Sequence, residues 1–340
     1  MKRLAKITIV LISWLILISS CTDKTTNSPF DDMLSKPPYS GLTDSIKKEP
    51  ANDELYFRRA VLLNSNNLAD PALADFKKAW SLKKDEKYAV GIGNLLLEKK
   101  PDSAILYLES ALKELPKSFL LQLTLARSLY ALDKITEALK ICNDLLQKNP
   151  EQVDMMKLKA ELLDKTGNTT EAISILERAY QLTPYNIDLN YELAYKYAEN
   201  KNAKVIALCD SLIRIDTLGY HAEPYYYKGI YFSNINDKST ALELFGQAIQ
   251  HDFNYLNAYI EKGKIQLSQK KINVALKTFQ LANTISPQFA DAYYWIAKCQ
   301  EELGQKDEAK LNYQRAYGLD NTFKEAKEAA DKIKSDNRDN

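Results

Sequence analysis

The sequence predicts an all-α solenoid of stacked helix hairpins, because one residue pattern recurs eight times. Each copy has a small residue (valine in the fifth), an apolar residue four positions later, and a small or aliphatic residue three positions beyond that. The leading residues are separated by 32, 34, 34, 33, 36, 34 and 34 positions, a period typical of helix-turn-helix repeats. The copies are Ala72-Phe76-Ala79, Ala104-Leu108-Ala111, Ala138-Cys142-Leu145, Ala172-Leu176-Ala179, Val205-Cys209-Leu212, Ala241-Phe245-Ala248, Ala275-Phe279-Ala282 and Ala309-Tyr313-Ala316.

Each copy marks the buried stripe of the second helix of a hairpin, because residues at i, i+4 and i+7 share one helix face. A further small residue stands twelve positions before most leading residues and marks the first helix, at Ala60, Ala126, Ala160, Gly229, Gly263 and Ala297. Prolines close four of the units, at Pro116, Pro150, Pro184 and Pro287. One hairpin cannot bury both of its faces, so the hairpins are expected to stack along a continuous core.

Aromatic residues four positions before several of these small residues, at Tyr56, Tyr225, Tyr259 and Tyr293, complete a pattern that resembles the tetratricopeptide repeat family. The resemblance implies a right-handed superhelix of about eight repeats over residues 53–321. Two repeats depart from the pattern: the second has Gly91-Ile92-Gly93 at the small position, and the fifth is one residue short before Val205. Residues 322–340 are expected to form a polar capping helix at 323–333 and a polar tail.

Residues 1–20 have the features of a bacterial lipoprotein signal peptide. Lys2, Arg3 and Lys6 precede an apolar run at residues 7–18, which is too short to span a bilayer of about 30 Å. The segment ends Ile18-Ser19-Ser20-Cys21, which resembles a lipobox and implies cleavage before an acylated Cys21. A plain signal peptide or an uncleaved anchor are the alternatives.

Residues 21–52 are expected to form a lipid-anchored, mostly extended tether, because prolines at positions 29, 37, 38 and 50 stand among polar residues. Thr22 rather than aspartate follows Cys21, which favours the outer membrane under the retention rule known for such lipoproteins. Asp23 is followed by Lys24 and not by an acidic run, so the periplasmic face is favoured, and surface exposure stays open.

Composition and chemistry-bearing residues point away from catalysis. Without Lys2, Arg3 and Lys6 the chain has 46 − 3 = 43 basic and 45 acidic residues, and no long basic run suggests nucleic acid. The two histidines, His221 and His251, have no second ligand at metal-binding spacing. No catalytic, cofactor or metal site is therefore predicted, and Cys142 and Cys209 are expected to be buried thiols.

The best candidate site is a groove lined by the first helix of each repeat, as the resemblance implies. Residues 185–231 contain nine tyrosines, more than the core stripe can use, and tyrosine suits recognition surfaces. The lysine and asparagine pairing of chaperone-binding members is replaced by Phe57 with Val61 and Tyr226 with Ile230. The predicted groove residues are Phe57, Tyr191, Tyr195, Tyr226, Tyr227, Ile230, Glu261, Lys264, Tyr294, Trp295 and Lys298.

These features predict a non-catalytic, lipid-anchored scaffold that recruits or assembles an envelope machine through protein partners. Secretion, motility, a pilus and peptidoglycan-hydrolase recruitment are the processes served by similar lipoproteins, and the fold does not choose among them. The alternative is a binding protein for a glycan or another small ligand, with Trp295 and the tyrosines stacking on sugar rings.

Overall fold

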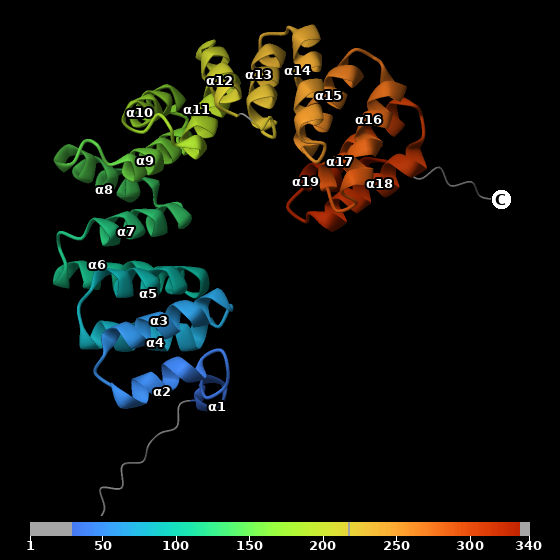
Figure 1. Cartoon of the computed structure of the whole chain (residues 1–340). Helices are drawn as coiled ribbons and strands as arrows, with labels where there is room; N and C mark the ends of the chain where they lie inside the picture. Colours follow the sequence, from blue (N-terminus) through green and yellow to red (C-terminus); the bar gives the residue numbers. More distant parts are fainter. Residues whose placement is uncertain (1–28, 217, 334–340) are drawn as a thin grey trace, which may run out of the picture. The chain divides into compact units, whose positions relative to one another are not determined.

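The computed structural model describes residues 29–216 and 218–333, and every regular element in these ranges is an α-helix. The chain divides into two compact units, Met1–Ile141 and Cys142–Asn340. Within each unit the helices pack as hairpins that follow one another in chain order (Figure 1). The predicted all-α repeat class is confirmed. The predicted signal peptide and Cys21 lie outside the described residues, as does the polar tail at 334–340.

The helix bounds match eight two-helix repeats with additional helices at both ends. The first unit contains α1 (Asp31–Leu34) and α2 (Ser40–Lys48), the hairpins α3 (Asp53–Ser65) with α4 (Ala69–Leu82) and α5 (Glu86–Lys99) with α6 (Pro101–Glu114), then α7 (Phe119–Ala131) and the start of α8 (Ile135–Lys148). The second unit contains the rest of α8, then α9 (Val153–Lys165) with α10 (Thr169–Leu182), α11 (Ile187–Glu199) with α12 (Lys204–Ile215), α13 (Glu223–Asn234) with α14 (Lys238–His251), α15 (Leu256–Ser268) with α16 (Ile272–Ile285), α17 (Ala290–Glu302) with α18 (Lys306–Leu319), and α19 (Lys324–Lys332).

The eight-fold pattern of small and apolar residues forms the core. None of its 24 side chains is more than 5% exposed. The small residues permit close helix contact: a Cβ atom added at Gly229 would lie 2.6 Å from the Phe245 ring, and one at Gly263 would lie 2.3 Å from the Phe279 ring. Glycine is required there because no side-chain atom fits between the two helices.

Seven of the eight hairpins close with the same turn. The second residue after the first helix has a positive φ, between 54° and 82°, at Asn67, Asp133, Gly167, Lys201, Asn236, Lys270 and Gly304. The next N–H donates to a carbonyl five residues back at 2.8–3.0 Å, as from Leu68 to Leu63, which satisfies a helix-end carbonyl. The second hairpin differs, since Lys100 alone separates α5 from Pro101 at the start of α6.

The prediction of an extended tether is wrong for residues 29–52. Helices α1 and α2 fold against the first repeat and bury Leu34, Tyr39 and Ile46 in its core. Thr43 of α2 donates to the Leu34 carbonyl at 2.7 Å and accepts a hydrogen bond from Arg59 of α3 at 2.9 Å. The proline-rich composition predicts an extended chain, but these three buried side chains, together with the partly buried Phe30 and Met33, pack against the first repeat. This segment therefore caps the solenoid.

The C-terminal end is also covered. Helix α19 packs on α18 within the expected range 323–333 and buries Ala326, Ala330 and Ile333. Among the helices at residues 29–216 and 218–333, none combines the length and the apolar character needed to cross a membrane. Cys142, Cys209 and Cys299 are buried free thiols, and burial raises the pKa of each to about 12.

Candidate functional site

All eleven predicted groove residues lie on the first helix of a repeat. Phe57 belongs to α3 in the first unit. The other ten belong to α11, α13, α15 and α17 in the second unit, where all except Ile230 form two groups of contacting side chains.

The larger group is a tyrosine cluster that joins three successive repeats. We define it as Tyr191, Tyr195, Tyr226, Tyr227 and Tyr255. The ring centroid of Tyr227 lies 6.1 Å from those of Tyr191 and Tyr195 on α11 and 5.8 Å from that of Tyr226. Tyr255, which precedes α15, lies 5.2 Å from Tyr226. Tyr255 was not predicted, because it stands in a loop outside the helix register.

The tyrosine cluster is half-buried, and its phenols are neutral at physiological pH. Tyr195 is the most open member, with 41% of its surface exposed. Burial raises the pKa of Tyr227 to about 12 and is also the main cause of the raised pKa of Tyr191, Tyr226 and Tyr255. A neutral hydroxyl can donate one hydrogen bond and accept others.

The hydroxyls of the tyrosine cluster have no hydrogen-bond partner within the described part of the chain. Five buried tyrosines elsewhere do: Tyr197, for example, donates to Glu177 at 2.7 Å, and Tyr259 donates to the Phe253 carbonyl at 3.2 Å. The others are Tyr56, Tyr88 and Tyr313. The cluster therefore presents rings and free polar groups together, as recognition surfaces do.

The second group surrounds Trp295. Its ring stacks on Phe279 at 5.8 Å and meets Tyr294 edge-on at 5.4 Å. Lys264 Nζ lies 5.7 Å from the centroid of the Trp295 ring and 2.8 Å from Glu261 Oε1. Lys298 Nζ lies 5.5 Å from the Tyr294 ring. These two lysines are thus already engaged by rings and carboxylates of the protein.

Two predicted groove residues join neither group. Phe57 packs on Phe76 and Tyr88 in the first unit, at centroid distances of 5.9 and 5.4 Å, and joins none of the other predicted residues. Ile230 is only 7% exposed. Tyr226 and Tyr227 precede it by four and three positions, so their rings share its helix face and leave it no room at the surface.

One exposed apolar edge was missed by the sequence reasoning. Three successive loops between repeats expose Tyr185 (90%), Leu218 (73%), Tyr220 (71%) and Phe253 (59%). The loop after α12 is fixed where His251 Nδ1 donates to the Gly219 carbonyl at 2.6 Å. The spacing of 36 residues after Val205 was the available signal, because the additional residues fall in this loop.

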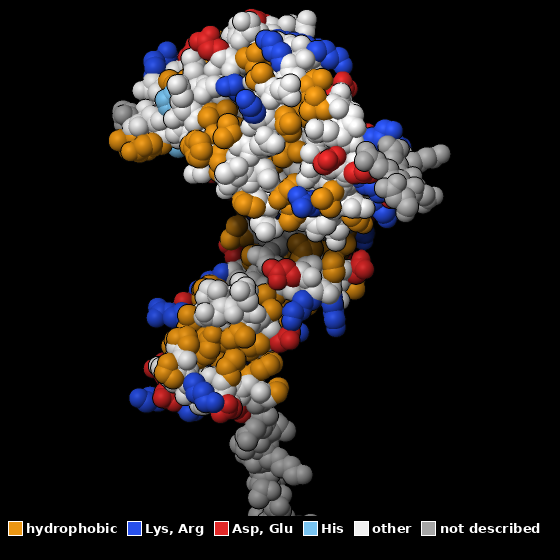
Figure 2. All heavy atoms as spheres, turned by 90° about the vertical axis from the view of Figure 1, so that its right-hand side faces the viewer, with side chains coloured by type: hydrophobic (Ala, Val, Ile, Leu, Met, Phe, Trp, Pro, Cys, Tyr) orange, Lys and Arg blue, Asp and Glu red, His pale blue; other side chains and the backbone are white. Residues whose placement is uncertain are grey.

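The charged surface is mixed. Figure 2 shows basic, acidic and hydrophobic side chains interspersed on the face that it presents.

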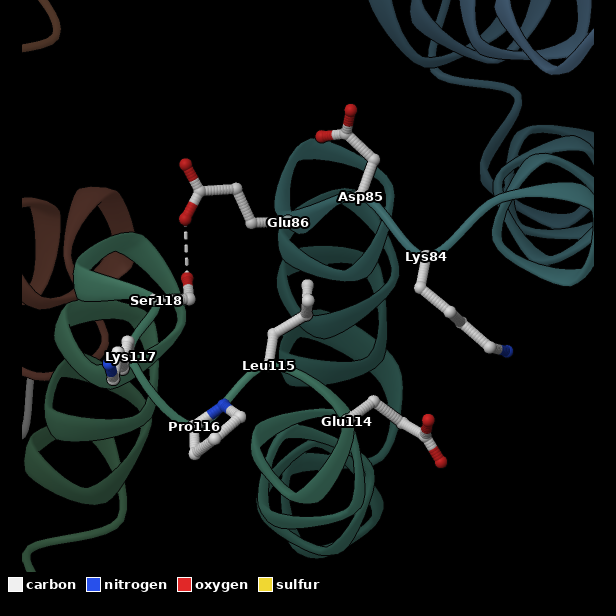
Figure 3. A pocket seen from close by; sticks show the side chains of 8 residues that line it. All are labelled: Lys84, Asp85, Glu86, Glu114, Leu115, Pro116, Lys117 and Ser118. Atoms are coloured by element: carbon white, nitrogen blue, oxygen red, sulfur yellow. Dashed lines mark hydrogen bonds between the residues drawn. The ribbon is translucent and has the colours of Figure 1, made fainter.

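In the first unit a hollow of about 480 Å³ lies between two neighbouring inter-repeat loops, lined by residues 84–86 and 114–118 (Figure 3). Ser118 donates to Glu86 at 2.5 Å and accepts from the Leu121 N–H at 3.1 Å, so its hydroxyl caps α7. The described residues contain no cluster of three metal-ligating side chains.

Tetratricopeptide repeat family models match residues 95–162, 155–186 and 290–323. The chain contains tetratricopeptide repeats. A mouse (Mus musculus) interferon-induced protein with tetratricopeptide repeats 3 is 30% identical over 129 residues, which cover 36% of this chain and 32% of the mouse protein. The chain therefore matches about a third of the length of that relative.

One solved structure with these repeats resembles the chain in fold. A tetratricopeptide repeat protein from Parabacteroides merdae aligns with a TM-score of 0.58 at 16% identity, over 72% of this chain and 96% of its own. The Cut9-Hcn1 hetero-tetramer of the APC/C aligns with a TM-score of 0.47 at 15% identity, over 87% of this chain and 58% of that one. Tetratricopeptide repeats indicate a scaffold for protein interactions.

Proposed function

We propose that this protein is a non-catalytic adaptor of the bacterial cell envelope that holds a protein partner at the tyrosine cluster. The proposal rests on five tyrosines whose rings contact one another and whose hydroxyls have no hydrogen-bond partner in the described part of the chain. Such rings offer contact area at low entropic cost, and the hydroxyls add directed hydrogen bonds.

The membrane attachment belongs to the same proposal. An acylated Cys21 holds the protein at the periplasmic face of the outer membrane, where it serves one of the machines named above. The first helix among the described residues, α1, begins at Asp31, so nine residues, 22–30, lie between Cys21 and this helix. At about 3.3–3.6 Å per residue these residues reach about 30 Å at most. The adaptor therefore stays closer to the membrane than a 31-residue tether would allow.

A glycan-binding role has less support. Of the rings predicted to stack on sugars, Trp295 already stacks on Phe279 and has the Lys264 ammonium group near it. In the tyrosine cluster, five rings and five hydroxyls without a partner among the described residues extend over three repeats, a span that suits a protein segment. Protein binding is therefore the function that the geometry supports best.

The partner site is tested by capture from crosslinked envelopes with Tyr195→Ala and Tyr227→Ala combined. Truncating anchors of this kind costs about 2 kcal/mol or more in binding, so the partner recovered with the parent should be lost. Tyr226 and Trp295 are left intact because they pack on the buried rings of Phe245 and Phe279. The matched control is Tyr185→Ala with Tyr220→Ala, on the exposed loop edge. Retention of the partner by a folded cluster variant would exclude the cluster.

The anchor is tested separately with Cys21→Ser, which should release a soluble form from the membrane fraction. Mass spectrometry of the parent should find an acylated N-terminal cysteine. An unmodified N terminus at another residue would remove the anchor from the proposal and leave the partner site untouched.

A further inference from the structure

Two carboxylates share a helix face with members of the tyrosine cluster: Glu199 follows Tyr195 by four positions on α11, and Glu223 precedes Tyr227 by four positions on α13. Glu199 and Glu261 add their negative charge to burial, the larger cause, in raising the pKa of both Tyr195 and Tyr226. Glu223 acts in the same way on Tyr191, Tyr227 and Tyr255. A negative field thus covers all three repeats that contribute to the cluster.

The lysines near the cluster are already paired. Lys264 bonds Glu261 at 2.8 Å, and Lys196 pairs with Asp164. Glu223 has only His221, at 3.9 Å, and Glu199 has no ion-pair partner among residues 29–216 and 218–333. Two carboxylates next to the open rings therefore have no lysine or arginine opposite them.

The rings of this face attract cations from the protein itself. Lys196 Nζ lies 5.9 Å from the centroid of the Tyr195 ring, and Lys264 and Lys298 lie at similar distances from Trp295 and Tyr294. A cation within about 6 Å of an aromatic centroid is drawn to the negative ring face. The same chemistry is open to a cation from outside.

We propose that the tyrosine cluster binds a cationic segment of its partner, with a lysine or arginine over the rings of Tyr195 and Tyr227 and with Glu199 and Glu223 as counter-charges. This rests on the proposed function of the cluster as the partner site. The free tyrosine hydroxyls accept hydrogen bonds from a guanidinium group or from backbone N–H groups of the segment. An acidic segment would be repelled by the two carboxylates, because like charges in an interface are costly. The nearby lysines would not offset this repulsion, because they are already paired with carboxylates of the protein.

The test uses three labelled twelve-residue peptides, alternating Arg-Gly, Glu-Gly or Ser-Gly, and the full chain purified in detergent. Fluorescence anisotropy should show the Arg-Gly peptide binding at least about tenfold more tightly than the other two, and more weakly as salt rises. Tyr195→Ala with Tyr227→Ala should lower its affinity at least about tenfold. Tyr195→Phe, which keeps the ring, should retain most of it.

The carboxylates are tested with Glu199→Gln and Glu223→Gln combined, a nearly isosteric change that leaves the fold intact. Affinity for the Arg-Gly peptide should fall several-fold, and its salt dependence should flatten. The matched control is Glu109→Gln with Glu243→Gln, two exposed helix carboxylates outside the cluster, which should change neither quantity. Equal binding of the Glu-Gly peptide, or Arg-Gly binding that ignores both cluster variants, would overturn the proposal.

The outcomes also separate this inference from the proposed function. If envelope capture depends on Tyr195 and Tyr227 while the Arg-Gly peptide shows no preference, the cluster is the partner site and its partner is not cationic. If the peptide behaves as described and no partner is captured through these tyrosines, the cation site stands and the adaptor proposal fails.

Discussion

In the first repeat the buried Arg59 side chain is fully engaged by the protein, whereas across the fifth to seventh repeats five tyrosine hydroxyls have no protein partner in the described part of the chain. Arg59 donates to both oxygens of Asp75, at 2.6 and 2.8 Å, and to Thr43 at 2.9 Å. Arg59 and Asp75 are both buried. Polar groups satisfied inside the protein contribute to folding, and those left unsatisfied at a half-buried surface are available to a ligand.

The largest effect that would sharpen this comparison is expected from Arg59→Ala. It leaves the Asp75 carboxylate buried without its partner, which costs about 3–5 kcal/mol of unfolding free energy. Urea unfolding at pH 7 measures it. The double variant Arg59→Met with Asp75→Leu removes both charges and should lose much less. A loss in the double variant as large as in Arg59→Ala would mean that packing, and not the unpaired charge, is responsible.

The deficit of Arg59→Ala should also depend on pH. Burial raises the pKa of Asp75, and Arg59 opposes that rise. Without Arg59 the folded pKa moves further above the unfolded value, so the ionised carboxylate destabilises the fold above that pKa. This cost begins to shrink as pH falls below the folded pKa and vanishes near the unfolded pKa. The deficit measured at pH 7 should therefore shrink as pH is lowered toward the unfolded pKa of Asp75, and a deficit that stays constant over this range would contradict the assignment.

A smaller effect is expected from Gly229→Leu in the sixth repeat, directly beneath the tyrosine cluster. The new side chain collides with the buried Phe245 ring, whose other neighbour is Tyr226, and overpacking of this kind costs about 1–3 kcal/mol or more. Gly318→Leu on α18 is the control, because a Cβ atom there meets nothing within 4 Å. Equal thermal stability of Gly229→Leu and the parent would show that the two helices do not approach as described.

The repeat register was predictable because it depends on close packing within one hairpin. Gly229 opposite Phe245 is a local steric match, and the sequence contains both partners at fixed spacing. The surface was only partly predictable. Ile230 occupies the same position in its repeat as the exposed Tyr195 does in the repeat before, yet Ile230 is buried. Whether a side chain is covered depends on its neighbours on the adjacent turn and repeat, and one repeat's pattern does not contain them.

The burial of the N-terminal segment, residues 29–52, was likewise not predictable from its own sequence. Its composition is that of a flexible linker, yet its apolar residues Leu34, Tyr39 and Ile46 are buried against the first repeat. The docking surface that receives them belongs to the first repeat, so the helix at residues 40–48 follows from the tertiary structure and not from local propensity.

The smallest effect compares two tyrosines two residues apart on α11. Tyr197 is buried and donates to Glu177, which also accepts from Lys204 at 2.6 Å, so Tyr197→Phe loses one hydrogen bond while Glu177 keeps a partner. The expected cost is about 0.5–1.5 kcal/mol. Tyr195→Phe removes a hydroxyl that has no protein partner among the described residues, so its thermal stability should stay within about 0.5 kcal/mol of the parent. If Tyr195→Phe costs as much as Tyr197→Phe, the cluster hydroxyls serve the fold, and the distinction between satisfied and available polar groups fails for this protein.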